Sequence, residues 1–279
     1  AAETWRLIGL AVGALLILPL AVIDDLRRLG PGPQFVGQMV VALAALAFGI
    51  VIESVANPFG DLIPLPWPVA VPLTILWIVG MINTINFIDS VDGLATGVAA
   101  IAAAILLLRS VELEQWSIAV LPLALLGTCL GFLPFNFHPA RVFLGTSGSM
   151  LLGYALAVLA IIGGAKIATA VMVLGLPIAD VALVIVQRLL RGRSPFKGGD
   201  YAHLHHQLVL RGWSQPRVAL FLYACCALAG WLALALSRTV KLYLFVGVSL
   251  VLLVLIFLLA RRLRQRLDAP GHGRGEISL

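Results

Sequence analysis

The chain reads Asn-Thr-Ile-Asn-Phe-Ile-Asp-Ser-Val-Asp-Gly-Leu-Ala over residues 83–95, a polar stretch between two apolar runs. Amides and carboxylates recur here every three residues, at Asn83, Asn86, Asp89 and Asp92, and Gly93 follows them. An isolated aspartate near the middle of a bilayer costs roughly 2.5–3.5 kcal/mol, so such groups usually face a cavity or a partner. The stretch therefore indicates a helix end that opens into a site for a cation or a phosphate.

The composition indicates a membrane protein. Hydrophobic residues make up 61% of the chain and charged residues 11%, and the mean hydropathy is +1.05. Because a membrane-spanning helix needs about 20 apolar residues, the sequence predicts an all-α, polytopic helical bundle of about nine spans. These spans lie near 5–23, 35–53, 69–88, 93–109, 117–135, 147–164, 167–187, 217–236 and 242–260.

The basic residues predict the orientation of these spans, since cytoplasmic loops carry an excess of Lys and Arg. We place the loop that follows Asp24 and Asp25 in the cytoplasm and let the spans alternate. Of the 19 basic residues, the opposite side then holds only Arg6, Arg109, Lys166, Arg238 and Lys241. The net charge of +6 follows from this topology and from attraction to anionic lipid headgroups, and does not indicate a nucleic-acid partner.

Four polar clusters fall on the predicted cytoplasmic face. They are the pair Asp24-Asp25, the segment 83–92, the loop 136–149 and the segment 194–206. A membrane enzyme with a soluble, charged co-substrate needs polar groups that converge in this way. The sequence therefore predicts an active site on the cytoplasmic face.

Each cluster also has a purely structural interpretation. The aspartate pair could be a solvated helix end, although the macrodipole disfavours carboxylates at a helix C-terminus. Asp89 or Asp92 could be the N-cap of the following span. Residues 145–149 could be a simple turn or a cradle for an anion. Three histidines within four positions, 203–206, favour anion binding or acid–base chemistry over a solvated loop.

Taken together, these motifs resemble the polyprenyl-phosphate N-acetylhexosamine-1-phosphate transferases, a superfamily that includes the phospho-MurNAc-pentapeptide translocase. The resemblance covers about residues 20–265. The form of the segment from Ser194 to His206 is closer to the GlcNAc-1-phosphate branch. The matching positions are Asp24 and Asp25; Asn83, Asn86, Asp89, Asp92, Gly93 and Leu94; Pro139, Ala140, Phe143 and Gly145; and His203, His205 and His206.

The resemblance implies that a sugar-1-phosphate, GlcNAc-1-phosphate in this branch, moves from a UDP-sugar to undecaprenyl phosphate with release of UMP. Such chemistry depends mostly on positioning and charge neutralisation, so Mg²⁺ is the expected cofactor. Asp24 is then the base that acts on the acceptor phosphate, and Asp25 supports it or the metal. Asn86 and Asp89 line the metal and diphosphate site, where Thr146 occupies a further metal-ligand position.

The resemblance also assigns the binding of the nucleotide-sugar. Asp92 and Phe143 are expected to contact the uracil by hydrogen bonding and stacking. His205 is expected to hold the diphosphate and to stabilise developing charge. Its neighbours His203 and His206, and Arg193 in the same basic loop, are expected to bind the substrate.

The remaining expectations concern context. Residues 1–265 are expected to form the transmembrane transferase domain, without the first one or two helices of the family, and 266–279 a cytoplasmic tail. The expected location is a bacterial cytoplasmic (inner) membrane, in the first membrane step of cell-envelope glycan synthesis such as cell-wall or lipopolysaccharide formation. Partners are the UDP-sugar, undecaprenyl phosphate and membrane lipid, with no nucleic acid; a homodimer is left open.

Two departures from the family pattern leave an alternative open. A metal-binding aspartate of the family is Thr146 here, and a basic residue is Gln34. The chain could therefore be an impaired or non-catalytic member that binds prenyl phosphate or a nucleotide. A secondary transporter with intramembrane carboxylates is a third interpretation, but it does not explain why the clusters share one face, and no inverted repeat is visible.

Overall fold

The computed structural model describes residues 2–55, 57, 62–162, 166–190, 192, 203–236 and 239–240. Within these ranges the chain forms a helical bundle, as predicted, with one short antiparallel pair of strands, β1 (Ser54–Val55) and β2 (Ile63–Pro64). The helices are α1 (Ala2–Arg27), α2 (Pro31–Ala47), α3 (Trp67–Ile88), α4 (Leu94–Glu112), α5 (Trp116–Asn136), α6 (Gly145–Ile161), α7 (Ile167–Val173), α8 (Gly175–Leu190), α9 (Leu204–Leu210) and α10 (Gln215–Ala235).

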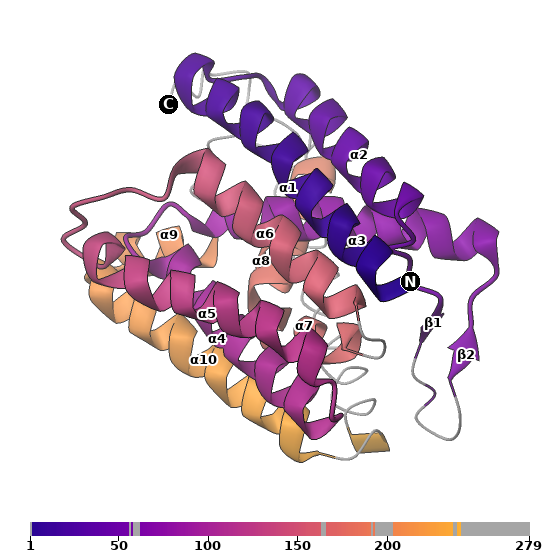
Figure 1. The fold of residues 1–279 in the computed structure, drawn as a ribbon. Helices are drawn as coiled ribbons and strands as arrows, with labels where there is room; N and C mark the ends of the chain where they lie inside the picture. Colours follow the sequence, from indigo (N-terminus) through magenta and orange to yellow (C-terminus); the bar gives the residue numbers. More distant parts are fainter. Residues whose placement is uncertain are drawn as a thin grey trace, which may run out of the picture.

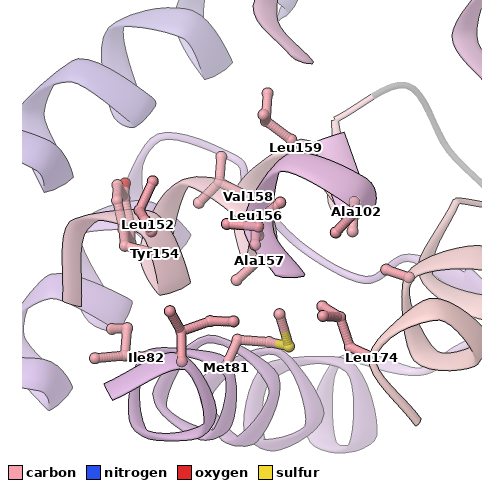
Figure 2. Packing of buried hydrophobic residues seen from close by; sticks show 14 of the residues in the cluster. Met81, Ile82, Ala102, Leu152, Tyr154, Leu156, Ala157, Val158, Leu159 and Leu174 are labelled. Atoms are coloured by element: carbon pink, nitrogen blue, oxygen red, sulfur yellow. The ribbon is translucent and has the colours of Figure 1, made fainter. Parts of the chain in front are cut away.

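Helix α6 is the centre of the bundle. It packs against α1, α3 and α4, and nearly all of its residues from Ser149 to Ile161 are buried. A Cβ atom on Gly153 would lie 2.7 Å from the Ile82 Cα, so this glycine allows α6 and α3 to approach closely. Figure 2 shows Met81 and Ile82 of α3 facing the apolar side chains of α6, Ala157 among them. A helix that is apolar on all sides is expected to be buried, as α6 is.

The predicted spans correspond closely to the observed helices. Helices stand in place of the predicted spans up to 217–236, whereas 242–260 and the predicted tail 266–279 lie outside the described residues. Five of the described helices, α1, α3, α4, α5 and α10, are long and apolar enough to cross a membrane. Helices α2 and α6, with 17 residues each, are shorter apolar helices.

One predicted span, 167–187, is wrong as a single straight helix. The chain bends by 74° between α7 and α8, and the two count as a sixth span only if they are taken together. Pro177 explains the break, because it lacks an N–H group and its ring would clash with the carbonyl of Val173 four residues earlier. Gly175 stands at the start of α8, where the chain changes direction.

The arrangement of the helices brings distant segments to one end of the molecule. Helix α1 packs on α2 and α6 along one flank, and α4 packs on α5 and α10 along the other, with α3 between them (Figure 1). The N-terminus and the strands β1 and β2 lie at the end opposite α9 (Figure 1). The polar clusters of the sequence gather at the α9 end, around the last turn of α1, the C-terminus of α3 and the N-terminus of α6.

Candidate active site

Asp24 is held by the helix that follows it. It lies in the last turn of α1 and is only 7% exposed. Gln34, in the first turn of α2, donates a hydrogen bond from Nε2 to Asp24 Oδ1 at 2.7 Å. No other described residue donates a hydrogen bond to this carboxylate. One oxygen of Asp24 is therefore fixed in place while the other remains able to accept a proton.

Asp25 lies at the N-terminus of α6. Its carboxylate accepts hydrogen bonds from the backbone N–H of Thr146 at 2.8 Å and of Ser147 at 3.0 Å, and from the Ser147 hydroxyl at 2.5 Å. Free N–H groups and the helix dipole favour an anion at such a helix start. Gly145 has φ +69°, and a Cβ atom there would lie 3.2 Å from Asp25 Oδ2. Of the two interpretations left open for residues 145–149, a turn or a cradle for an anion, the structure favours the cradle, and the anion it holds is the side chain of Asp25.

The polar stretch between α3 and α4 forms the turn that joins the clusters. Asn86 Oδ1 accepts a hydrogen bond from Ser149 Oγ at 2.8 Å, which ties the end of α3 to α6. Asp89 caps the C-terminus of α3, and Gly93, with φ +76°, is the N-cap of α4 without any side-chain capping bond. The interpretation of Asp89 or Asp92 as an N-cap is therefore wrong, because a glycine in the left-handed conformation makes this turn instead.

Asp89 lacks the partners that its neighbours have. It is partly buried, and no described residue donates a hydrogen bond to its carboxylate. Burial, together with the charges of Asp25 and Asp92, raises the pKa of Asp89 to about 7. Desolvation and nearby like charges both disfavour an ionised carboxylate. This part of the site therefore has an excess of negative charge that a cation would relieve.

Asp92 faces the loop between α5 and α6. Its Oδ2 accepts a hydrogen bond from His138 Nδ1 at 2.9 Å and another from the Ala140 backbone N–H at 3.1 Å. The Phe143 side chain in the same loop is 75% exposed. The structure thus brings Asp92 and the Phe143 loop together, and it adds His138, which the sequence motifs did not single out.

The three histidines pack together at the start of α9. His203 donates from Nδ1 to Asp180 Oδ2 at 2.9 Å, and Asp180 Oδ1 accepts the Leu204 backbone N–H at 2.8 Å. The rings of His203 and His205 are stacked at 5.5 Å with an interplanar angle of 9°, and the His206 ring lies 4.4 Å from that of His205. Asp180 of α8 therefore anchors the segment.

His205 connects this segment to the turn between α3 and α4. Its Nε2 lies 2.7 Å from the Ser90 hydroxyl, and Ser90 is only one residue from Asp89. The carboxylates, Asn86, the Phe143 loop and the histidines thus form one continuous site. Arg193, also predicted to bind substrate, lies outside the described residues.

The residues at this site suit a magnesium ion better than a transition metal. Among the described residues, no three His, Cys, Asp or Glu side chains converge to hold a metal ion by themselves. Mg²⁺ requires few protein ligands, since it keeps several waters and often binds substrate phosphates. Asp89, a partly buried carboxylate to which no described residue donates a hydrogen bond, and the amide oxygen of Asn86 are ligands of the right kind. Thr146 offers only a neutral hydroxyl, and that side chain interacts with Asp25.

Comparison with known proteins identifies relatives of this chain. The chain is 34% identical over 259 residues to a protein of Bacillus subtilis (strain 168) named "Probable undecaprenyl-phosphate N-acetylglucosaminyl 1-phosphate transferase", and the alignment covers 90% of this chain and 72% of the relative. It is 34% identical over 237 residues to the phospho-N-acetylmuramoyl-pentapeptide-transferase of Moorella thermoacetica, covering 81% of this chain and 73% of the relative.

A mycobacterial relative is longer. Over 239 residues the chain is 34% identical to the decaprenyl-phosphate N-acetylglucosaminephosphotransferase of Mycobacterium leprae (strain TN), covering 76% of this chain and 60% of that protein. The chain thus spans about three fifths of the length of this relative.

A family model described as glycosyl transferase family 4 matches residues 7–164. That range is more than half of the chain, and it contains every site residue from Asp24 to Thr146 but none of the histidines of α9 and its N-cap. The resemblance identified from the motifs is confirmed, and the chain belongs to glycosyl transferase family 4.

Proposed function

We propose that this chain transfers GlcNAc-1-phosphate from UDP-GlcNAc to undecaprenyl phosphate and releases UMP, on the cytoplasmic side of a bacterial inner membrane. The product would be a lipid-linked intermediate for a cell-envelope glycan. The observation that carries the proposal is the joined site, in which three groups meet beside apolar helices. They are a carboxylate at a helix end, a partly buried carboxylate that receives no hydrogen bond from the described residues, and a histidine cluster. The relatives, which are named as prenyl-phosphate sugar-1-phosphate transferases, support the same reaction class.

Asp24 suits the acceptor side of the reaction. The acceptor phosphate gives up its proton to the free oxygen of Asp24, and the freed phosphate oxygen attacks the β-phosphorus of the UDP-sugar. The bond between this phosphorus and the oxygen that bridges to UMP then breaks, and UMP leaves with its electron pair. Gln34 keeps the Asp24 carboxylate oriented by its hydrogen bond to Oδ1, and Asp25 fixes the end of α1 against α6.

The other clusters suit the donor. Asp92 would contact the uracil by hydrogen bonding and Phe143 by stacking; the exposed ring of Phe143 and its position in the loop that contacts Asp92 support this proposal. The histidines, together with Arg193, are the groups proposed to bind the diphosphate. Asp89 and Asn86 would hold Mg²⁺, which when bound neutralises charge on the diphosphate.

The raised pKa of Asp89 leads to a stability prediction. The pKa of Asp89 is raised in the folded state to about 7 from its ordinary value of 3.8, so ionisation of this carboxyl group costs stability as pH rises through that interval. Asp89→Asn should therefore raise the unfolding temperature of the purified chain at about pH 8 without divalent cations, and much less at about pH 5.

Magnesium provides the control for this measurement. Added Mg²⁺ should raise the unfolding temperature of the unmodified chain, because a ligand that binds only the folded state stabilises it, and should leave Asp89→Asn unchanged. Scanning fluorimetry with detergent-solubilised protein measures both effects. A variant that is less stable than the unmodified chain at the higher pH would show that Asp89 is not the strained carboxylate of the site.

A specific observation favours a second candidate function. Thr146 is neutral and its side chain interacts with Asp25, so this position supplies no charge to a metal. A chain that binds prenyl phosphate or a nucleotide without turnover would have the same fold and the same histidine cluster. This second function predicts binding of UDP-GlcNAc with no transfer at any Mg²⁺ concentration.

The experiment that tests the proposal separates these two functions. Purified chain is incubated with UDP-GlcNAc radiolabelled in the sugar, undecaprenyl phosphate and Mg²⁺, and lipid-linked label is extracted; a parallel sample contains a chelator. We expect label in the lipid fraction that disappears with the chelator. Nucleotide binding by calorimetry without any lipid-linked label would instead support the second function.

A further inference from the structure

Ser90 separates the buried His205 from the open side of the site. The His205 side chain is only 1% exposed, whereas Ser90 is exposed. The Ser90 hydroxyl lies 2.7 Å from His205 Nε2, so the imidazole nitrogen nearest the carboxylate turn is already occupied. The His205 ring can therefore act on a ligand from this nitrogen only through Ser90.

The surroundings of His205 hold the ring in one position and keep it neutral. It stacks on His203, which is itself fixed by the hydrogen bond to Asp180. Burial has the largest effect on the pKa of His205 and, with the neighbouring His206, lowers it to about 4. The charge of Asp180 raises this pKa, but by less. A neutral imidazole carries one hydrogen, which lies on either Nδ1 or Nε2.

The two tautomers give Ser90 different properties. If Nε2 is bare, the Ser90 hydroxyl donates to it and has no hydrogen left for a ligand. If Nε2 carries the hydrogen, it donates to Ser90 Oγ, and the serine hydrogen is free to point outward. An anionic oxygen next to Ser90 selects the second arrangement, because a hydrogen bond to a charged acceptor is stronger than one to a neutral nitrogen.

We infer that Ser90 is a substrate-binding residue, whose hydroxyl, oriented by His205 Nε2–H, donates a hydrogen bond to a diphosphate oxygen of the nucleotide-sugar. This inference rests on the proposed function and specifies how its donor is held. Ser90 lies in the turn that carries Asp89, which is proposed to hold the metal, and Asp92, which is proposed to contact the uracil. The same turn would thus supply both the metal ligand Asp89 and a neutral hydrogen-bond donor, Ser90, to the diphosphate.

The test is the affinity of the full chain for UDP and UDP-GlcNAc, measured by calorimetry for Ser90→Ala and Ser90→Thr. Loss of one hydrogen bond to a charged group should raise the Kd of the alanine variant about tenfold or more, and threonine, which keeps the hydroxyl, should restore most of the affinity. Ser117→Ala is a matched control, since Ser117 is bonded to Glu3 far from the site and its loss should leave Kd unchanged.

A spectroscopic measurement checks the relay itself. In chain labelled with nitrogen-15 at histidine, addition of UDP should shift His205 toward the tautomer with hydrogen on Nε2, and Ser90→Ala should lose this response. If Ser90→Ala and the unmodified chain bound UDP and UDP-GlcNAc with equal affinity, the role of Ser90 would be overturned but the proposed function would not. An unmodified chain that binds neither UDP nor UDP-GlcNAc would overturn the proposed function as well, so the two failures are distinguishable.

Discussion

Asp24→Asn should lower the rate of sugar-phosphate transfer by about 10²- to 10⁴-fold, the range that a positioned general base contributes. Asparagine has nearly the same shape as aspartate and can still accept the hydrogen bond that Gln34 donates to Oδ1 at 2.7 Å. It cannot take a proton from the acceptor phosphate. The fold should therefore survive the change while the reaction does not.

The measurement is the turnover rate at saturating UDP-GlcNAc and undecaprenyl phosphate, together with the unfolding temperature. Glu53→Gln is the control, because Glu53 pairs with Arg6 away from the site, and its rate should stay near that of the unmodified chain. A rate for Asp24→Asn within a few-fold of the unmodified chain would remove Asp24 as the base.

Thr146→Asp should raise the affinity for Mg²⁺ about 100-fold and raise the transfer rate with it, because ligand charge is a main determinant of affinity for such cations. Position 146 lies in the first turn of α6, where its backbone N–H already contacts Asp25. A new carboxylate there adds negative charge beside Asp25 and Asp89. The N-terminus of α6 offsets part of the repulsion, and a bound cation would offset the rest.

Two further readouts make this prediction specific. Without divalent cations, Thr146→Asp should unfold at a lower temperature than the unmodified chain. With Mg²⁺ present, it should unfold at a higher temperature than the unmodified chain. Thr146→Asn, which has the same shape as the aspartate variant but no charge, should change neither the Mg²⁺ affinity nor the rate appreciably. Unaltered affinity and rate in Thr146→Asp would mean that the metal is held elsewhere.

Much of the fold could be predicted from apolar runs alone. In a bilayer every backbone polar group must be paired within the chain, so long apolar runs have to become helices. The predicted boundaries fail where a local rule competes, as at Pro177, which divides the predicted span 167–187 into α7 and α8. The ninth predicted span, 242–260, stays a prediction, since it lies outside the described residues.

The candidate site was predictable in its residue types but not in its contacts. The spacing of Asn86, Asp89 and Asp92 indicates a helix end that opens into a polar site, and the structure brings this segment against α6 and α9. Which partner each side chain has depends on helix packing between segments far apart in the chain, such as Ser90 and His205, 115 positions apart. Ser90 is one small polar residue among several, so the sequence around it carries no signal of that contact.

His138 shows the same limit. It lies in a loop that the motifs had already marked, yet its interaction with Asp92 arises only from the way α5 and α6 place that loop over the start of α4. Asp25 is the converse case. Its carboxylate was expected to support catalysis or a metal, and in the structure its first contacts are with the N-terminus of α6. Its proposed catalytic support is therefore exerted by holding α1, and with it Asp24, against the rest of the site.

The proposed reaction transfers a sugar together with its phosphate. The most direct measurement uses UDP-GlcNAc with radioactive phosphorus in its β-phosphate and tritium in its sugar, incubated with the chain, undecaprenyl phosphate and Mg²⁺. Both labels should enter the lipid fraction in equal amounts, and UMP should be the released nucleotide. Tritium in the lipid without the β-phosphate, with release of UDP, would contradict the account, because the bond broken would then be the one between the sugar and its phosphate.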